Sequence, residues 1–144
     1  MTVAILSTGG TIASTSDSGT NAEPSLDADD LAGAVPELEA ITSIRTHSFL
    51  NVPSPHVGID RMYDLVEALE RLASDPDVDG VVVTHGTDSL EETALFADLC
   101  YGDETTVVFT GAMRNPSLPS PDGPNNVLGS VRIAAHPDPP HNVL

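Results

Sequence analysis

The feature of this 144-residue chain that most constrains its fold is the alternation of short apolar, β-branched runs with longer amphipathic stretches. Residues 80–84 (GVVVT) and 106–110 (TVVFT) are such runs, and residues 62–72 repeat apolar side chains at helical spacing. This alternation is typical of βα units, which build a mostly parallel sheet. A strand that is apolar along its whole length is covered by helices on both faces. The sequence therefore predicts a three-layer α/β fold with a mostly parallel sheet.

Strands are expected at several places along the chain, with different degrees of burial. Polar Arg45 and His47 alternate with apolar residues, which is typical of a strand with one half-exposed face. The expected strands cover residues 3–6, 41–50, 80–84 and 106–110, and residues 142–144 are expected to open another.

Helices are expected between and after these strands. Ser25 or Asp27 is available as the N-cap of the first helix, and Asp60 is the expected N-cap of the second. Residues 89–92 (SLEE) have the spacing of a capping box at the start of the third. The expected helices cover residues 26–35, 60–72, 90–99 and about 126–135.

No internal repeat, low-complexity tract or linker divides the sequence, so residues 1–144 are expected to form one domain. Residues 14–24 are polar and contain glycine, a composition that permits a mobile lid. The single cysteine, Cys100, cannot form an internal disulfide and lies in an apolar helical pattern. Its side chain is expected to be a small buried hydrophobe.

The charge balance excludes two classes of partner. Asp and Glu together number 22 against 5 basic residues, all of them Arg, for a formal net charge of -17. Nucleic acids and anionic membranes draw affinity from basic side chains, so neither is an expected partner. An acidic surface without Lys also keeps a protein hydrated in concentrated salt, where repulsion is screened within about 3 Å. A halophilic source is expected, and an ordinary acidic cytosolic protein is the alternative.

The first residues of the chain carry no basic segment and no apolar stretch long enough for a signal peptide or a membrane span. The cytoplasm is therefore the expected compartment.

Small polar residues follow each of the expected strands. In an open parallel sheet, ligands bind outside the carboxyl ends of the strands, where the loops converge. The segments at this rim are residues 8–11 (TGGT), 51–54 (NVPS), 85–89 (HGTDS) and 111–114 (GAMR). Glycines at 9 and 10 allow a sharp turn and a close approach of substrate, and Thr11 presents a hydroxyl there. Thr11 is a candidate nucleophile.

Each rim segment also has a simpler interpretation when it is taken alone. Thr11 can belong to a structural glycine turn in which its hydroxyl bonds the backbone, and Asp88 can be an N-cap. His85 is expected to be a packed loop histidine, and the five His form no recognisable metal constellation. The sequence lacks the GxGxxG, GxxxxGK[ST] and GxSxG patterns of phosphate loops and serine hydrolases. Neither a metal nor a cofactor is expected.

Four segments in order resemble motifs of the bacterial-type, type II-like L-asparaginase/glutaminase family. Two of them resemble the signature segments of that family, and the resemblance covers nearly the whole chain. The segments are residues 5–13 (ILSTGGTIA), 80–90 (GVVVTHGTDSL), 110–114 (TGAMR) and 122–126 (DGPNN). The resemblance implies a Rossmann/flavodoxin-like N-terminal domain that hydrolyses L-asparagine to L-aspartate and ammonia.

The resemblance also implies a role for three catalytic residues. Thr11 is the primary nucleophile and forms an acyl-enzyme after it attacks the side-chain amide. The Thr87 hydroxyl assists proton transfer and activates water. Asp88 holds the α-ammonium group of the substrate.

Substrate-binding positions follow from the same resemblance. Ser54 is the expected ligand of the α-carboxylate, and the backbone near Thr87 and Ala112 is expected to position the amide. Backbone N–H donors in such turns stabilise an oxyanion by roughly 10²- to 10³-fold each. The expected substrate-binding residues are Gly10, Ser54, Pro55, Gly86 and Ala112. The substrate is L-asparagine, with L-glutamine as a further candidate.

Several residues depart from the family pattern. Ser89 replaces the usual Thr, and Pro55 stands where some relatives contact the substrate through a side-chain amide. Residues 14–24 contain no Tyr, the residue that closes over the nucleophile in well-known members. The 144 residues also contain no Lys, whereas the family places a catalytic Lys beyond the next strand. The chain is therefore expected to be truncated before that Lys and the C-terminal domain, and to have weak activity or none by itself.

Two other functions share part of these features. An asparaginase-like subunit of a tRNA-dependent amidotransferase carries the same motifs, but with an extra N-terminal domain. A non-catalytic ligand-binding α/β module keeps the rim without the Lys. The family resemblance implies that the full-length form is a homo-oligomer, a dimer or a tetramer.

Overall fold

The structure is a computed structural model that describes residues 1–15, 23–138 and 143–144. Its centre is a four-stranded sheet with the order β4-β1-β5-β6, and every neighbouring pair in this sheet is parallel. The strands are β1 (Thr2–Gly9), β4 (Ser43–Val52), β5 (Gly80–Thr84) and β6 (Thr106–Thr110). The predicted parallel α/β architecture is confirmed.

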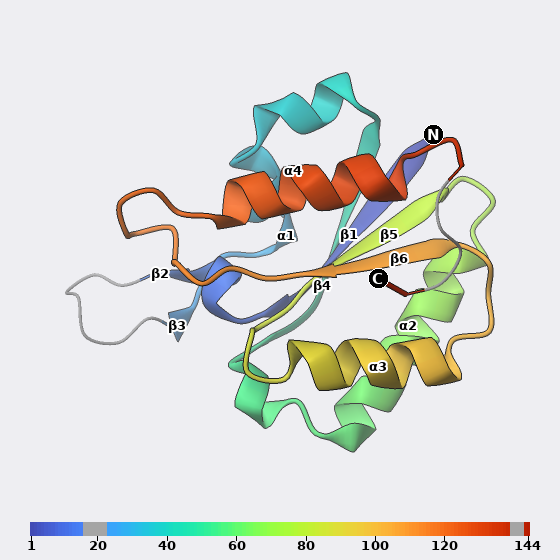
Figure 1. Ribbon diagram of the computed structural model, residues 1–144, viewed down its shortest axis with the longest axis horizontal. Coiled ribbons are helices and arrows are strands. Elements are labelled where there is room, and N and C mark those ends of the chain that lie inside the picture. The colour runs from blue at the N-terminus through green and yellow to red at the C-terminus, as the bar shows by residue number, and fades with distance from the viewer. Residues whose placement is uncertain (16–22, 139–142) are drawn as a thin grey trace.

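Helices cover both faces of the sheet and complete the three layers (Figure 1). One face carries α1 (Ala28–Gly33) and α4 (Gly123–Ala134), and the other carries α2 (Ile59–Ala73) and α3 (Leu90–Cys100). The remaining elements are short: η1 (Thr11–Ala13), η2 (Pro36–Ala40), η3 (Ser54–His56), and an antiparallel pair of β2 (Ser14–Thr15) and β3 (Glu23–Pro24).

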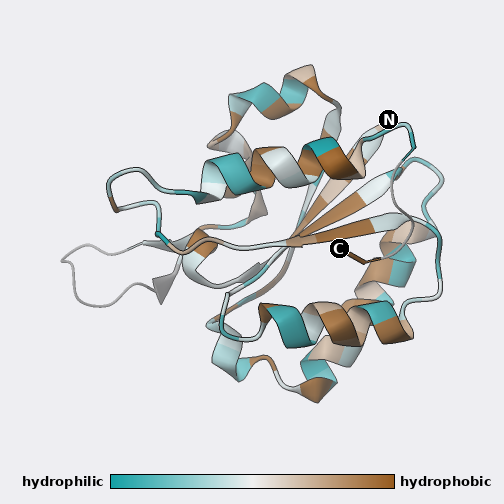
Figure 2. Cartoon of the chain, viewed as in Figure 1, coloured by the Kyte–Doolittle hydropathy of each residue, from teal (hydrophilic) through white to brown (hydrophobic). Residues whose placement is uncertain are grey.

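The core lies in two layers, one on each face of the sheet. On β5, Val82 packs into the cluster beneath α1 and α4, whereas Val81 and Val83 pack into the cluster beneath α2 and α3. All three side chains have 0% exposure, as expected for a strand covered on both faces. Figure 2 shows the apolar colour along the central strands. The edge strand β4 has no fully buried residue, and its Arg45 and His47 are exposed.

Helix boundaries correct two of the predictions. The N-cap of α2 is Gly58, so Asp60 lies in the first turn and does not cap the helix. Helix α4 begins at Gly123 rather than near Asn126, because Pro124 in its first turn is compatible with helix and has no N–H to lose there. Of the two candidate caps for α1, Asp27 is the one used, in a capping box with Asp30.

Helix α3 begins where the sequence predicts but without the predicted capping box. Ser89 is the N-cap residue by its position, and its side chain makes no capping hydrogen bond. Its Oγ donates instead to the carbonyl oxygen of Ser54, at 2.8 Å. At the other end of the helix, Cys100 is exposed, which contradicts the expectation that it is buried.

The last two residues of the chain lie beside β6. Val143 forms a parallel bridge with Val107, and the Leu144 N–H donates to the Val107 carbonyl at 2.9 Å. The predicted opening of another strand is therefore present at Val143, while Asn142 lies outside the described residues.

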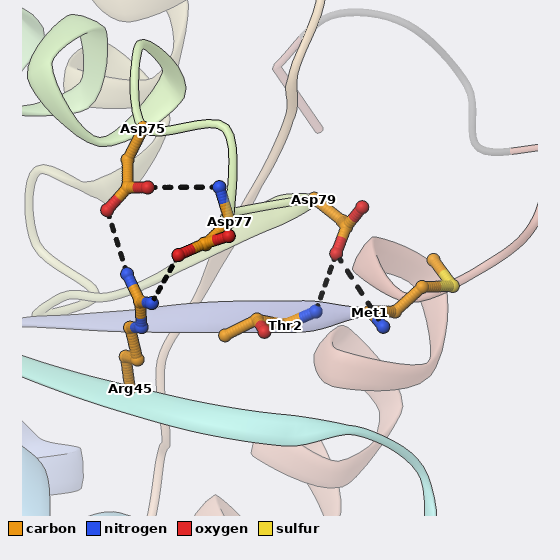
Figure 3. A network of polar contacts seen from close by, with 6 residues as sticks. All are labelled: Met1, Thr2, Arg45, Asp75, Asp77 and Asp79. Atoms are coloured by element: carbon orange, nitrogen blue, oxygen red, sulfur yellow. Dashed lines mark hydrogen bonds and ion pairs between the residues drawn. The ribbon is translucent and has the colours of Figure 1, made fainter.

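A polar network ties the chain together at the amino ends of the strands (Figure 3). Arg45 contacts Asp75 at 2.8 Å and Asp77 at 3.3 Å, which joins β4 to the loop before β5. Asp79 accepts a hydrogen bond of 2.6 Å from the Thr2 N–H. The side chains of Arg45 and Asp77 are exposed, so solvent screening keeps the contribution of these pairs to stability small. Within the described residues, no helix is long and apolar enough to cross a membrane.

Candidate functional site

The loops that follow β1 and β5 touch through glycines. Gly10 has φ +81°, and a Cβ placed on it would lie 2.3 Å from the Gly86 Cα. Real side chains do not come that close, so only glycine allows these two backbones to meet. Thr11 and Thr87, which come directly after the two glycines, are thereby brought to the same part of the rim.

The loop after β4 joins this contact through Ser54. A Cβ on Gly86 would lie 2.5 Å from the Ser54 Oγ, so the serine packs directly on the glycine backbone. Ser54 is the first residue of η3 and is 3% exposed. The structure thus brings Gly10, Gly86 and Ser54, from the segments that follow three different strands, into one stack.

Two hydrogen bonds connect Asp88 and Ser54, and the Ser54 Oγ is the donor in one and the acceptor in the other. The Ser54 Oγ donates to the Asp88 Oδ2 at 3.2 Å, and the Asp88 N–H donates to the Ser54 Oγ at 3.2 Å. The alternative interpretation of Asp88 as an N-cap is wrong, because α3 begins after Ser89 and the Asp88 carboxylate faces Ser54. A hydroxyl and a carboxylate side by side offer one ligand for an anionic group and one for a cationic group.

Both candidate hydroxyls are accessible. Thr87 is exposed and Thr11 is partly exposed. Within residues 1–15, 23–138 and 143–144, the structure gives neither hydroxyl a hydrogen-bond partner. The Gly10 carbonyl, by contrast, is fixed by the Ser14 Oγ at 2.7 Å, a contact that the sequence reasoning did not find.

The turn after β6 closes the other side of the rim. A Cβ on Gly111 would lie 2.7 Å from the His85 carbonyl oxygen and 3.2 Å from the Thr87 Cγ2. Ala112, next in the chain, is 1% exposed. An open pocket of 290 Å³ lies between this turn, Thr87 and the start of α4; it is lined by Thr87, Leu90, Asp122, Asn126 and residues 109–113.

His85 lies beneath this loop and is fully buried, as predicted for a packed histidine. Its Nδ1 is 2.9 Å from the Gly86 carbonyl oxygen, and its ring is tilted against Phe109 with centroids 6.4 Å apart. Burial lowers the pKa of His85, and the hydrogen bond to Gly86 opposes this effect only in part. The ring is therefore neutral and donates from Nδ1, and its buried Nε2 has no partner among the described residues.

The remaining predicted positions lie at the edge of this constellation. Pro55 is exposed in η3 beside Ser54. Of the segment expected to form a lid, Ser14, Thr15, Glu23 and Pro24 form the β2–β3 pair, and residues 16–22 lie outside the described residues. Among the described residues, no group of three or more His, Cys, Asp or Glu side chains is arranged to hold a metal ion.

Fold and rim together define an α/β protein that presents hydroxyls and a carboxylate at the carboxyl ends of parallel strands. The family model described as "Asparaginase, N-terminal" matches residues 2–144. The chain belongs to the asparaginase family, within its N-terminal domain.

Known relatives agree with this membership. The chain is 37% identical over 140 residues to L-asparaginase 2 of Bacillus subtilis, and 43% identical over 139 residues to a probable L-asparaginase of Deinococcus radiodurans. These alignments cover 94% of this chain but only 37% and 40% of the relatives. A crystal structure of a probable cytoplasmic L-asparaginase from Campylobacter jejuni matches with a TM-score of 0.88 and 36% identity, over 94% of this chain and 42% of that one. The chain therefore spans less than half the length of each relative.

Proposed function

We propose that this domain carries the nucleophile and the substrate-binding rim of an enzyme that hydrolyses L-asparagine to L-aspartate and ammonia. The observation that carries the proposal is the contact of Gly10 with Gly86 and of Gly86 with Ser54. This contact gathers two accessible threonine hydroxyls and one carboxylate around a space at the rim. Relatives named L-asparaginase support the same reaction.

The Ser54–Asp88 pair is suited to the two charged ends of an amino acid. The Asp88 carboxylate holds the α-ammonium group, and the Ser54 hydroxyl donates to the α-carboxylate. Their mutual hydrogen bonds at 3.2 Å fix the spacing between the two anchors. A substrate held at this end projects its side-chain amide toward the threonines, which favours reaction through proximity and orientation.

Thr11 is the proposed nucleophile. Its Oγ attacks the amide carbon, and the hydroxyl proton passes to the amide nitrogen. The tetrahedral intermediate then expels ammonia as the C–N bond breaks, which leaves an ester on Thr11. Backbone N–H groups near Thr87 and Ala112 stabilise the oxyanion, each by roughly 10²- to 10³-fold. Water, oriented by the Thr87 hydroxyl, then cleaves the ester and releases L-aspartate.

Ammonia release from L-asparagine by the purified protein tests this proposal. Because Thr11 forms the covalent intermediate, Thr11→Ala is expected to abolish the ammonia release that the unmodified protein shows. Thr105→Ala, the same substitution in the loop before β6, is the matched control and is expected to keep full activity. A Thr11→Ala protein that retained a tenth of the activity would contradict the assignment.

L-Glutamine is the second candidate substrate. A relative from Pseudomonas aeruginosa, 38% identical over 136 residues, is named glutaminase-asparaginase. The same assay with L-glutamine is expected to show release of ammonia through the same Thr11-dependent reaction. Release that survives the Thr11→Ala substitution would exclude a common site.

We also infer a cytoplasmic location, a salt-adapted source and a homo-oligomeric complete form. The location is supported by the name of the Campylobacter jejuni relative. The salt adaptation is supported by the formal net charge of -17 without any Lys. Size-exclusion chromatography with light scattering tests the oligomeric form, which a monomeric mass would contradict.

A further inference from the structure

The turn of residues 111–114 after β6 is held on both sides from the start of α4. The Asp122 carboxylate accepts hydrogen bonds from the Met113 N–H at 3.0 Å and from the Arg114 N–H at 2.8 Å. The Asn126 Nδ2 donates to the Gly111 carbonyl oxygen at 2.9 Å. These bonds reach the turn immediately before and immediately after Ala112.

The two clamping side chains are also joined to each other. The Asn126 Nδ2 lies 3.3 Å from the Asp122 Oδ2, so one carboxylate oxygen is shared between α4 and the turn. Asp122 occupies the N-cap position of α4, yet its side chain makes no capping bond to its own helix. The carboxylate serves the turn instead, and hydrogen bonds to a charged acceptor are about twice as strong as neutral ones.

The donors of the turn keep this carboxylate ionised. The Met113 N–H, followed by the Arg114 N–H, lowers the pKa of Asp122 below its ordinary value, and desolvation opposes this effect only in part. The clamp is therefore present throughout the neutral pH range.

The opposite side of the turn rests on the loop that carries Thr87. The Gly111 backbone packs on the His85 carbonyl, where a Cβ would lie at 2.7 Å. The start of α4 packs beside η1, because a Cβ on Gly123 would lie 3.0 Å from the Ile12 Cγ1 and 3.6 Å from the Ala112 Cβ. The turn therefore lies between the Thr87 loop and α4, and α4 also contacts Ile12, the residue after Thr11.

We propose that Asp122 and Asn126 are positioning residues, which hold the turn of residues 111–114 so that the Ala112 backbone faces the amide of the substrate. The proposal rests on the proposed function for its catalytic consequence. Both side chains act on the reaction through the turn that they hold. A shift of the turn removes transition-state stabilisation while the Ser54–Asp88 anchor stays in place.

Two variants and two matched controls test the proposal on the purified protein. Asp122→Asn replaces one acceptor oxygen by an amide NH2 group that faces a backbone N–H, and Asn126→Ala removes the bond to Gly111. Asp98→Asn makes the same change of charge on the exposed surface of α3. Asn125→Ala removes an exposed amide from the neighbouring position of α4.

The variants are expected to lower kcat for L-asparagine by about 10- to 100-fold, because a displaced oxyanion donor loses much of its effect. Their KM and their affinity for L-aspartate are expected to stay within about threefold, because the α-group anchors are intact. Amide hydrogen exchange at Met113 and Arg114 is expected to accelerate about tenfold, while exchange in the middle of α4 is unchanged. Both controls are expected to match the unmodified protein in every measurement.

Several results overturn the proposal. Unchanged exchange at Met113 and Arg114 in Asp122→Asn shows that the carboxylate does not hold the turn. Faster exchange with an unchanged kcat shows that the turn does not matter to the reaction. If the unmodified protein hydrolyses no amide, which is expected when the family's Lys is absent, the exchange measurement at Met113 and Arg114 alone decides whether the clamp exists.

Discussion

At the scale of single residues, the site depends on positions where backbones from different strands touch. Gly10 and Gly86 have no side-chain role, yet each lies where a Cβ would overlap a neighbouring loop. Hydroxyl and carboxylate groups at the rim are arranged by these contacts. Replacing a glycine here is therefore expected to disturb the site more than removing an exposed polar group.

The first prediction compares two glycines. Gly10→Ala combines a positive φ with a Cβ 2.3 Å from Gly86, so it is expected to destabilise the protein by about 2–5 kcal/mol. Gly129→Ala lies inside α4 with nothing within 4 Å of the added Cβ, and is expected to stabilise by about 0.5–1 kcal/mol. Urea unfolding of the two variants measures both values. Equal shifts of the midpoint would show that the loop contact is looser than described.

The second prediction concerns the buried ring of His85. Burial lowers the pKa of His85, so the unfolded state binds a proton more readily than the folded state does. The contribution of the neutral His85 ring to the free energy of unfolding is therefore complete above the unfolded pKa of about 6.5. It is lost as the pH falls toward the lower pKa of the folded state. Urea midpoints measured between about pH 7.5 and about pH 5 are expected to fall steadily.

A pair of variants isolates the contribution of His85 to this slope. His85→Asn can still donate to the Gly86 carbonyl but does not titrate, so it is expected to flatten the fall. His47→Asn makes the same exchange on the exposed edge strand and controls for the loss of one imidazole. An equal slope in His85→Asn and the unmodified protein would assign the pH dependence to other groups.

At the scale of elements, the apolar pattern predicts the buried face of α2 but not that of α3. In α2 the apolar residues recur at helical spacing, and Leu65, Val66 and Leu69 are buried. In α3 apolar residues lie on more than one side, and the helix buries Thr93 and Ala97 while Leu99 is 75% exposed. The expectation that Cys100 is buried fails for this reason: its apolar neighbours do not identify a single face.

The third prediction compares one leucine from each helix. Leu69, with 0% exposure on α2, is expected to cost about 2–5 kcal/mol when it is replaced by Ala, because the substitution leaves a cavity under the sheet. Leu99→Ala on α3 is expected to change stability by no more than about 0.5 kcal/mol. Thermal or urea unfolding measures the difference. A large loss in Leu99→Ala would mean that its side chain is covered in solution.

At the scale of the whole molecule, the dominant property is the formal net charge of -17. The described basic side chains include Arg45, which contacts Asp75 and Asp77, and Arg71, which lies 3.8 Å from Glu67. These pairs leave most of the acidic groups without a cation, so the folded chain repels itself. Self-repulsion of this kind is weakened by salt.

The fourth prediction is that salt stabilises the protein. Raising KCl from about 0.1 M to about 1 M shortens the screening length from about 10 Å to about 3 Å. The Tm is expected to rise by about 5 °C, which corresponds to about 1–2 kcal/mol for a chain of this size. Scanning calorimetry measures the shift. The triple variant Glu37→Gln, Glu39→Gln, Asp64→Asn carries fewer exposed charges and is expected to gain less; an equal or larger gain would contradict repulsion as the cause.

Much of the architecture is determined by the sequence, because strand and helix patterns are local. The boundaries of β5 and β6 agree with the apolar runs at 80–84 and 106–110, and the order of strands and helices requires a parallel sheet. The rim segments are also readable, since parallel strands end at one edge and small polar residues follow each of them. Family motifs at these positions then suggest the chemistry of Thr11 and Thr87.

The partners within the rim are decided only by the tertiary structure. Ser54 and Asp88 are 34 residues apart in the chain, and the family resemblance assigns them to the two α-groups of the substrate without predicting the hydrogen bonds between them. The Ser89 hydroxyl binds Ser54 rather than its own helix because the strand order β4-β1-β5-β6 brings the two loops together. The clamp of Asp122 and Asn126 on the turn after β6 has the same origin. Local periodicity, which determines the helices and strands, can be recognised in the sequence. Contacts between loops depend on strand order and register, which only the folded chain provides.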